Sequence, residues 1–158
     1  MLLVGVLAVL AVGTVMVYPL LYSSTNCGGN TAALNQVKEY ALFANMAVDN
    51  STNHTFQVSA VPPEQREQLA RLAHCSWMPN ARFFVSTTPL STNESHLRRL
   101  IIVCDTPYSN VPRYWLGSAP PTHAAGFSDG SSALISPAEF AALDRSSFAF
   151  LDELYPAK

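Results

Sequence analysis

The side chains that most often carry chemistry are sparse in this chain of 158 residues. Metal sites commonly pair two histidines one helical turn apart, or two cysteines as Cys-x-x-Cys, because those spacings bring both ligands to one side of the ion. The four histidines lie far apart, at His54, His74, His96 and His123. We therefore expect no metal and no cofactor, and we interpret these histidines as residues of solvated surface loops.

Catalytic motifs are also missing from the sequence. It has no Gly-x-Ser-x-Gly elbow, no phosphate-binding loop and no dinucleotide fingerprint. A membrane-tethered enzyme remains as an alternative, and it would require His123 to meet Asp105 and Asp129 in a pocket. Because any chain with four histidines and eleven acidic residues allows such a group to be drawn, we predict neither an enzyme nor a small-molecule substrate.

The three cysteines are Cys27, Cys75 and Cys104, so at least one thiol lies outside any bridge within the chain. An antiparallel hairpin of strands 81–88 and 97–104 would bring Cys104 near Ala81. A disulfide between Cys75 and Cys104 is then geometrically allowed. Two separate buried thiols are an equally good interpretation.

Three Asn-x-Ser/Thr triplets begin at Asn50, Asn53 and Asn93. This triplet is the acceptor sequence for N-glycosylation. It also arises by chance in loops rich in serine, threonine and asparagine. The three asparagines are therefore candidate glycosylation sites and no more.

Asp129 and Gly130 stand between two short strand-like stretches within residues 127–135, which predicts a hairpin. A two-residue turn of type I′ requires positive φ at both central residues, and glycine adopts positive φ at low cost. We therefore expect Asp129 and Gly130 to form a structural turn.

The overall charge excludes one class of partner. The formal net charge is −2 and the estimated pI is about 6.0. Proteins that bind nucleic acid normally present a basic field to the phosphates. We expect no nucleic-acid partner.

Residues 1–22 form an uncharged apolar run, and the first charged side chain is Lys38. As a helix this run would span ~33 Å, which matches a hydrocarbon core of ~30 Å. A cleaved signal peptide is the alternative, but no basic residue precedes the run and residues 22–26 are a poor cleavage site. We predict a single-pass membrane anchor with a periplasmic or extracellular head. The residues expected to face lipid or a neighbouring helix are Leu2, Leu3, Gly5, Leu7, Leu10, Gly13, Val17 and Pro19.

An α+β head is expected at 31–158, after a hinge at 23–30 that contains Gly28 and Gly29. Apolar residues then recur every three or four positions, which predicts an amphipathic helix over about 31–48. The residues of that stripe are Leu34, Val37, Ala41, Ala44 and Val48.

The rest of the head is expected to be a small antiparallel sheet with peripheral helices. We predict strands at 56–60, 81–88 and 97–104, because they alternate or are rich in β-branched and aromatic residues. We predict one helix at 64–74 and a second from Pro137, which Ser136 and Glu139 would cap. A final helix is expected to carry Phe148, Phe150, Leu151 and Leu154, and 105–122, with four prolines, is expected to be an irregular loop.

Several short segments match one family when taken together. They are Pro19-Leu20-Leu21, Cys27, 34–38 and 47–50 in the N-terminal half, and 125–131 and 134–140 in the C-terminal half. In this order they resemble the pseudopilin-like proteins of type II secretion and type IV pili, in particular a group with a His…Asp-Gly signature. The usual prepilin peptidase site is absent, because no acidic residue precedes Glu39.

The resemblance implies a structural or assembly protein that acts through helix packing and protein–protein contacts. Its expected partners are the membrane and other protein subunits, such as like chains in a filament. The alternative is a single-pass accessory subunit of a larger integral-membrane complex. The two hypotheses differ in the stoichiometry of the assembly.

Overall fold

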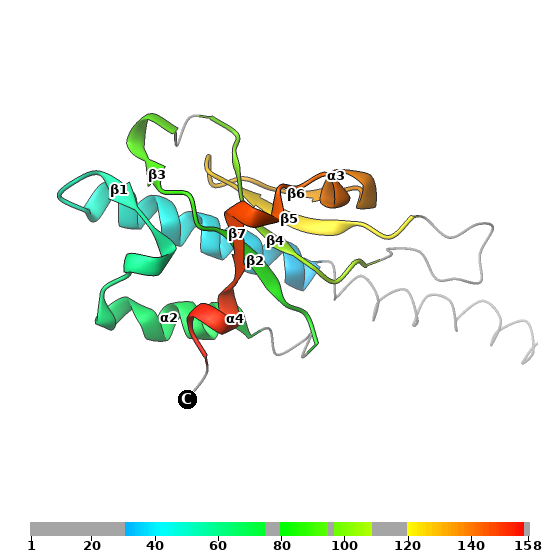
Figure 1. Cartoon of the computed structure of the whole chain (residues 1–158), viewed down its shortest axis with the longest axis horizontal. Helices are drawn as coiled ribbons and strands as arrows, with labels where there is room; N and C mark the ends of the chain where they lie inside the picture. The colour runs from blue at the N-terminus through cyan, green and yellow to red at the C-terminus, as the bar shows by residue number, and fades with distance from the viewer. Residues whose placement is uncertain (1–30, 75–79, 95–96, 109–119, 157–158) are drawn as a thin grey trace, which may run out of the picture.

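A computed structural model of the chain describes residues 31–74, 80–94, 97–108 and 120–156 (Figure 1). These residues combine helices with antiparallel sheets, which confirms the mixed class expected from the sequence. The predicted anchor at 1–22 and the predicted hinge at 23–30 lie outside the described residues. Within the described ranges, no helix has both the length and the apolar character needed to cross a membrane.

The first described helix covers residues 31–50 and runs across the sheet, drawn blue to cyan in Figure 1. Its predicted apolar stripe lies mostly inside, since four of its five members are buried and Leu34 is half-buried. Ala33 and Tyr40 join the same buried face. The helical period of the apolar residues therefore placed this element and its inner face correctly.

Five strands form one antiparallel sheet in the order β6-β5-β4-β2-β7. The predicted pairing of 81–88 with 97–104 is confirmed, because Phe83 lies opposite Cys104. β6 and β7 are the two edges. The bounds are β2 Phe83–Ser86, β4 Leu100–Cys104, β5 His123–Phe127, β6 Ser132–Ile135 and β7 Phe148–Phe150.

The 31–50 helix packs directly on one face of this sheet. At Gly126 in β5, an added Cβ would lie 2.6 Å from the carbonyl oxygen of Val37 and 2.7 Å from Cγ2 of Ile102. Close-packed interiors leave no room for such an atom. Glycine at this position therefore lets the helix backbone approach the strand. Val85 and Ile102 lie opposite one another on β2 and β4 and are fully buried.

The opposite face of the sheet carries half-buried aromatic side chains. Phe84 of β2 pairs with Phe150 of β7, and their ring centroids are 3.9 Å apart. Phe140 lies over the same face from α3 (Pro137–Ala141), with its ring centroid 6.3 Å from that of Phe84. This short helix begins with the predicted capping box, in which the Ser136 hydroxyl accepts a hydrogen bond from the Glu139 amide.

Shorter elements complete the head. α2 (Pro63–Ala73) matches the helix predicted at 64–74 and buries Leu69, Leu72 and Ala73. It packs near α4 (Leu151–Leu154) at the lower side of Figure 1. A separate two-stranded sheet pairs β1 with β3, and three 3-10 turns link the other elements. Their bounds are β1 Thr55–Phe56, β3 Leu90–Ser91, η1 Val58–Ala60, η2 Thr92–Glu94 and η3 Arg145–Ser147.

The strand predicted at 56–60 is mostly wrong. Only Phe56, opposite Leu90, belongs to a strand, and Val58–Ala60 forms the turn η1. Phe56 and Val58 are both buried, as the alternation predicted. The burial pattern was correct, but no partner strand extends past Phe56 to hold the backbone extended.

The final helix predicted around Phe148 is also wrong in part. Phe148–Phe150 forms β7, which pairs with β2, and only Leu151–Leu154 is helical. Every second residue of Phe-Ala-Phe faces the aromatic side of the sheet. Pairing and packing along β2 outweigh local helix propensity, which is a weak preference over so few residues.

Candidate functional site

His123 is buried at the start of β5, so the expectation that it lies on a solvated loop was wrong. Its side chain is 4% exposed, and its ring stacks on Phe140 with the centroids 3.9 Å apart. Nδ1 lies 3.0 Å from the carbonyl oxygen of Cys104. Because a carbonyl only accepts hydrogen bonds, Nδ1 carries the proton in this contact. His123 therefore joins β4, β5 and α3.

Neither acidic residue that an enzyme would need forms a hydrogen bond with His123 among the described residues. Asp129 lies past the other end of β5, a strand that spans about 13 Å. The Asp129 carboxylate accepts hydrogen bonds from the Ser131 hydroxyl at 2.5 Å and the Ser131 amide at 2.9 Å. These bonds, the hydroxyl above all, hold the pKa of Asp129 below its ordinary value. Asp105 instead accepts from the amide of Arg82 at 3.0 Å.

The other described histidines stand apart from one another. His54 and His74 are both exposed, and His96 lies outside the described residues. Among the residues that the structure describes, no three His, Cys, Asp or Glu side chains gather closely enough to hold a metal ion. The absence of a metal or cofactor in the whole chain stays a prediction.

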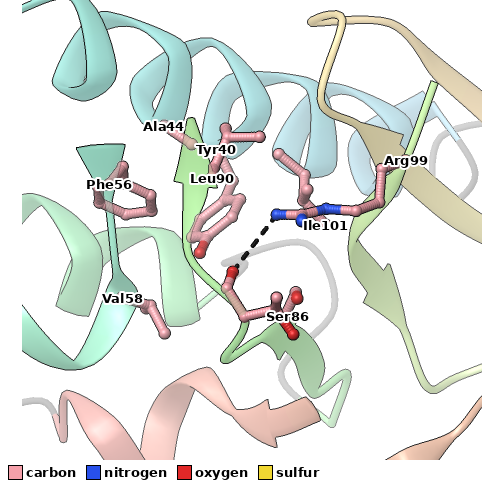
Figure 2. A pocket seen from close by; sticks show the side chains of 9 residues that line it. Tyr40, Ala44, Phe56, Val58, Ser86, Leu90, Arg99 and Ile101 are labelled. Atoms are coloured by element: carbon pink, nitrogen blue, oxygen red, sulfur yellow. Dashed lines mark hydrogen bonds between the residues drawn. The ribbon is translucent and has the colours of Figure 1, made fainter. Parts of the chain in front are cut away.

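A small cavity lies between the 31–50 helix and the sheet, and Tyr40 and Arg99 approach it from opposite sides (Figure 2). Its volume is about 10 Å³, close to the minimum for one water molecule. Burial raises the pKa of the Tyr40 hydroxyl above its ordinary value, so this group is neutral. The Arg99 guanidinium donates to Glu94 at 3.0 Å and to the carbonyl of Pro89 at 2.9 Å. The cavity is far too small for a substrate.

A larger cleft of about 430 Å³ lies open to solvent at the β1–β3 end of the head. His54 at its edge has φ 49°, the left-handed region, and its carbonyl accepts hydrogen bonds from both the amide and the hydroxyl of Thr92. Binding sites for small molecules are usually enclosed and mostly apolar. This cleft is open, and every residue that lines it has a polar side chain. Its lining residues are Asn53, His54, Thr55, Ser91, Thr92 and Asn93.

The candidate glycosylation sites all lie on the surface. Asn50, Asn53 and Asn93 are exposed, and the last two line the cleft described above. Their exposure is compatible with glycosylation, which stays a prediction.

Asp129 and Gly130 lie in the turn between β5 and β6, but the turn is not of the expected type. Gly130 has φ 77°, whereas Asp129 has no positive φ. The amide of Phe127 donates to the carbonyl of Ser131, so the loop holds three residues, with glycine in the left-handed position. Ser128 accounts for the extra residue, because it is fully buried and its hydroxyl bonds to the carbonyl of Leu97.

The predicted disulfide and the predicted anchor fall on segments that are not described. Cys104 is fully buried, with Sγ 3.6 Å from the carbonyl oxygen of Thr106, and Cys75 lies outside the described residues. All anchor residues, from Leu2 to Pro19, also lie outside them. The bridge and the anchor therefore stay predictions.

One surface feature was missed by the sequence reasoning. Large apolar side chains are exposed at Leu42, Met46 and Leu97, by 48%, 63% and 62%. Leu42 and Met46 are one helical turn apart, and Leu42 Cδ2 would lie 3.4 Å from a Cβ at Gly130. Leu42 and Leu97 thus border the turn between β5 and β6. The signal was available: Leu42 and Met46 are large apolar residues of the 31–48 segment that do not fit its predicted stripe.

Comparisons of the chain with protein-family models, with curated proteins and with solved structures found no match.

Proposed function

We propose that this chain is a membrane-anchored structural subunit of the pseudopilin-like kind, which works by helix packing and protein–protein contacts. The apolar run at 1–22 is the anchor and the α+β head faces the periplasm or the exterior. The head contributes surface for assembly and performs no reaction.

The observation that carries this proposal is the division of the 31–50 helix into two faces. One face is buried on the sheet, with Val37 and Ala44 at most 1% exposed. The outer face leaves Leu42 and Met46 in solvent, where large apolar side chains cost free energy unless a partner covers them. A helix with one face on its own sheet and apolar side chains left outside is suited to assembly.

The anchor is tested by the membrane retention of the full chain under alkaline extraction. Wild type is expected to stay with the membrane. Leu10→Arg is expected to be released in large part, because an arginine near the centre of an anchor costs about 3 kcal/mol. Leu10→Phe is the matched control and is expected to be retained. Release of the wild-type chain would remove the anchor from the proposal.

The contact role is tested by mild cross-linking in native membranes, followed by purification of the chain. Met46→Lys is expected to lower recovery of cross-linked partners about tenfold, since covering such a side chain is worth about 1.5 kcal/mol or more. Asn35→Lys adds the same charge to an exposed position three helical turns earlier, and it is expected to behave as wild type. Equal recovery from both variants would contradict a role for the Leu42–Met46 surface.

The same cross-linked material separates the two assembly hypotheses. Ladders made of this chain alone support a pseudopilin-like subunit. A fixed ratio with different membrane proteins supports an accessory subunit instead, and would replace the first hypothesis with the second.

A further inference from the structure

Among the residues that the structure describes, β6 is an unprotected edge of the five-stranded sheet. It pairs with β5 on one side only, and no charged residue occurs between Asp129 and Glu139. Proteins usually protect such an edge with lysine, proline, a bulge or a covering element, because its unpaired backbone groups attract another strand. Ser132–Ile135 contains none of these residues and no bulge in its pairing with β5.

The hydrogen-bond pattern shows which groups β6 offers. The amide of Phe127 donates to the carbonyl of Ser131, and hydrogen-bonded pairs recur at every second residue of an antiparallel ladder. Ala133 and Ile135 therefore bond toward β5. Ser132 and Leu134 direct their amides and carbonyls outward, where no described residue bonds them.

The other edge of the sheet differs in charge. Asp152 and Glu153 lie in α4, the helix that follows β7, and both carboxylates bind the guanidinium of Arg82. That guanidinium also lies 3.4 Å from the ring centroid of Phe150. A strand approaching β7 would meet charged groups, whereas β6 itself offers backbone groups and small or apolar side chains.

We propose that β6 is a self-association edge, on which a second copy of this chain adds its own β6 in the antiparallel direction. A second copy fits because both members of the pair offer the same alternating donors and acceptors, as a twofold interface requires. It also fits because the edge has no charges that would repel in an identical partner. The proposal rests on the proposed function in one respect: the anchors hold the copies in one membrane.

The outward groups also select the register. A dyad at Ala133 places Ser132 opposite Leu134 of the second copy, and the reverse, so all outward amides and carbonyls are used. A dyad at Leu134 would instead place Ser132 opposite Ser136. The Ser136 amide already donates to Glu139 at 2.7 Å, and its carbonyl accepts from Phe140 at 3.0 Å. The register centred on Ala133 is therefore favoured.

This contact is too small to hold the pair alone. Stable interfaces bury about 800 Å² on each partner, more than a four-residue edge offers even with Leu42, which borders the turn before it. Anchoring in one membrane supplies the missing affinity, because it raises the effective concentration of the second edge.

Antiparallel pairing turns the two 31–50 helices in opposite directions. Residues 23–30 can span up to about 26 Å, which lets both anchors enter one membrane when the sheets lie along its surface.

The register predicts a specific cross-link. Ala133 would face its own copy across a non-hydrogen-bonded position, where the two Cα atoms are about 4.5 Å apart and a disulfide fits. Full-length Ala133→Cys in vesicles is expected to form a disulfide-linked dimer under mild oxidation. Wild type, with its native cysteines, sets the background, and Ser146→Cys, an exposed residue near the other edge, is the matched control.

A charge exchange tests the identity of the partner. Two differently tagged copies are placed in the same vesicles and one tag is captured. With Ala133→Lys on both copies, capture of the other tag is expected to fall about fivefold, because like charges would stand directly opposite. Ala133→Glu on both copies is expected to do the same. Pairing the lysine copy with the glutamate copy is expected to restore capture, and Ala142→Lys on both copies is expected to leave it unchanged.

The outcomes of these experiments separate failure of the edge pairing from failure of the proposed function. If the chain stays in the vesicles but Ala133→Cys forms no more disulfide-linked dimer than the two controls, the edge pairing is wrong. The proposed function is not affected by that result. Failure of the mixed charges to restore capture also overturns it, as does a cross-link from the introduced thiol of Ala133→Cys to another protein in native membranes. If the chain leaves the vesicles, the proposed function fails. The same cysteine assay is then made in concentrated solution, where a weak contact is populated, and a dimer no greater than in both controls overturns the pairing.

Discussion

His54 shows how a single backbone angle can limit the choice of side chain. Its φ of 49° lies in the left-handed region, and its carbonyl is held there by Thr92. Branching at Cβ makes this conformation expensive, whereas asparagine adopts it readily. We expect His54→Val to lower the free energy of unfolding by about 1 to 2 kcal/mol in urea titrations. His54→Asn is the control and should change it by less than about 0.5 kcal/mol; equal losses would show that the imidazole, not the angle, matters.

The hydrogen bonds of the Asp129 carboxylate predict that the free energy of unfolding falls slightly at acid pH. Its folded-state pKa is held below the ordinary value by Ser131, so its contribution is present at neutral pH and disappears as pH falls through that lowered pKa. The carboxylate is exposed, which limits the contribution to about 0.5 kcal/mol or less. Asp129→Asn should therefore be less stable than wild type at pH 7 and nearly equal at pH 2. A difference that persists at pH 2 would contradict this assignment.

At the residue scale, sequence patterns predicted contacts between neighbours in the chain, but they did not predict where a residue lies in the fold. The capping residues Ser136 and Glu139 were found, because a cap depends only on neighbours in the chain. His123 was misjudged, because its burial depends on Phe140 and Cys104, which come from other elements. The exposed pair Leu42 and Met46 was not predicted, because the helical period of the apolar residues identifies only the inner stripe.

At the scale of elements, the contact between the 31–50 helix and β5 makes Gly126 the most sensitive glycine in the described head. A Cβ there meets the backbone of Val37 at 2.6 Å, and backbone cannot move aside as a flexible side chain does. We expect Gly126→Ala to reduce the free energy of unfolding by about 2 to 3 kcal/mol, measured by urea titration.

Gly130→Ala provides the comparison. The nearest atom to its added Cβ is 3.4 Å away, so any cost comes from its φ of 77°. We expect a loss of about 1 kcal/mol, which Gly130→Asn should partly recover because asparagine tolerates this region. If Gly126→Ala were the milder of the two alanine variants, direct backbone packing of the helix on β5 would be contradicted.

The elements themselves were predicted unevenly, and the reason is the range of the interactions. α2 and the 31–50 helix follow from apolar periodicity within one segment, and both were found. β7 was taken for helix, because its strand character exists only beside β2. Short elements that depend on a distant partner leave little signal in their own residues.

At the scale of the whole molecule, the sheet order could not have been read from the sequence. The two hairpin pairings were expected, but β5 also lies beside β4 and β7 lies beside β2, across long stretches of chain. The open edge at β6 follows only from that order. The candidate interaction surface is thus a property of the assembled sheet, and local patterns could not have predicted it.

The position of the core in the whole molecule predicts that the head is stable without the anchor. Every buried core residue of the described ranges lies between Ala33 and Tyr155, and all of them except Val103 and Ala125 form one cluster. A domain with its own core can fold alone. Removing residues 1–22 should therefore change the free energy of unfolding by less than about 1 kcal/mol, followed by circular dichroism in urea. Removing residues 1–40 also deletes Val37 and Tyr40, which are buried against the sheet, and should abolish the cooperative transition. If the shorter deletion abolished it as well, the apolar run would be part of the core of the head, and a separate membrane anchor would no longer be tenable.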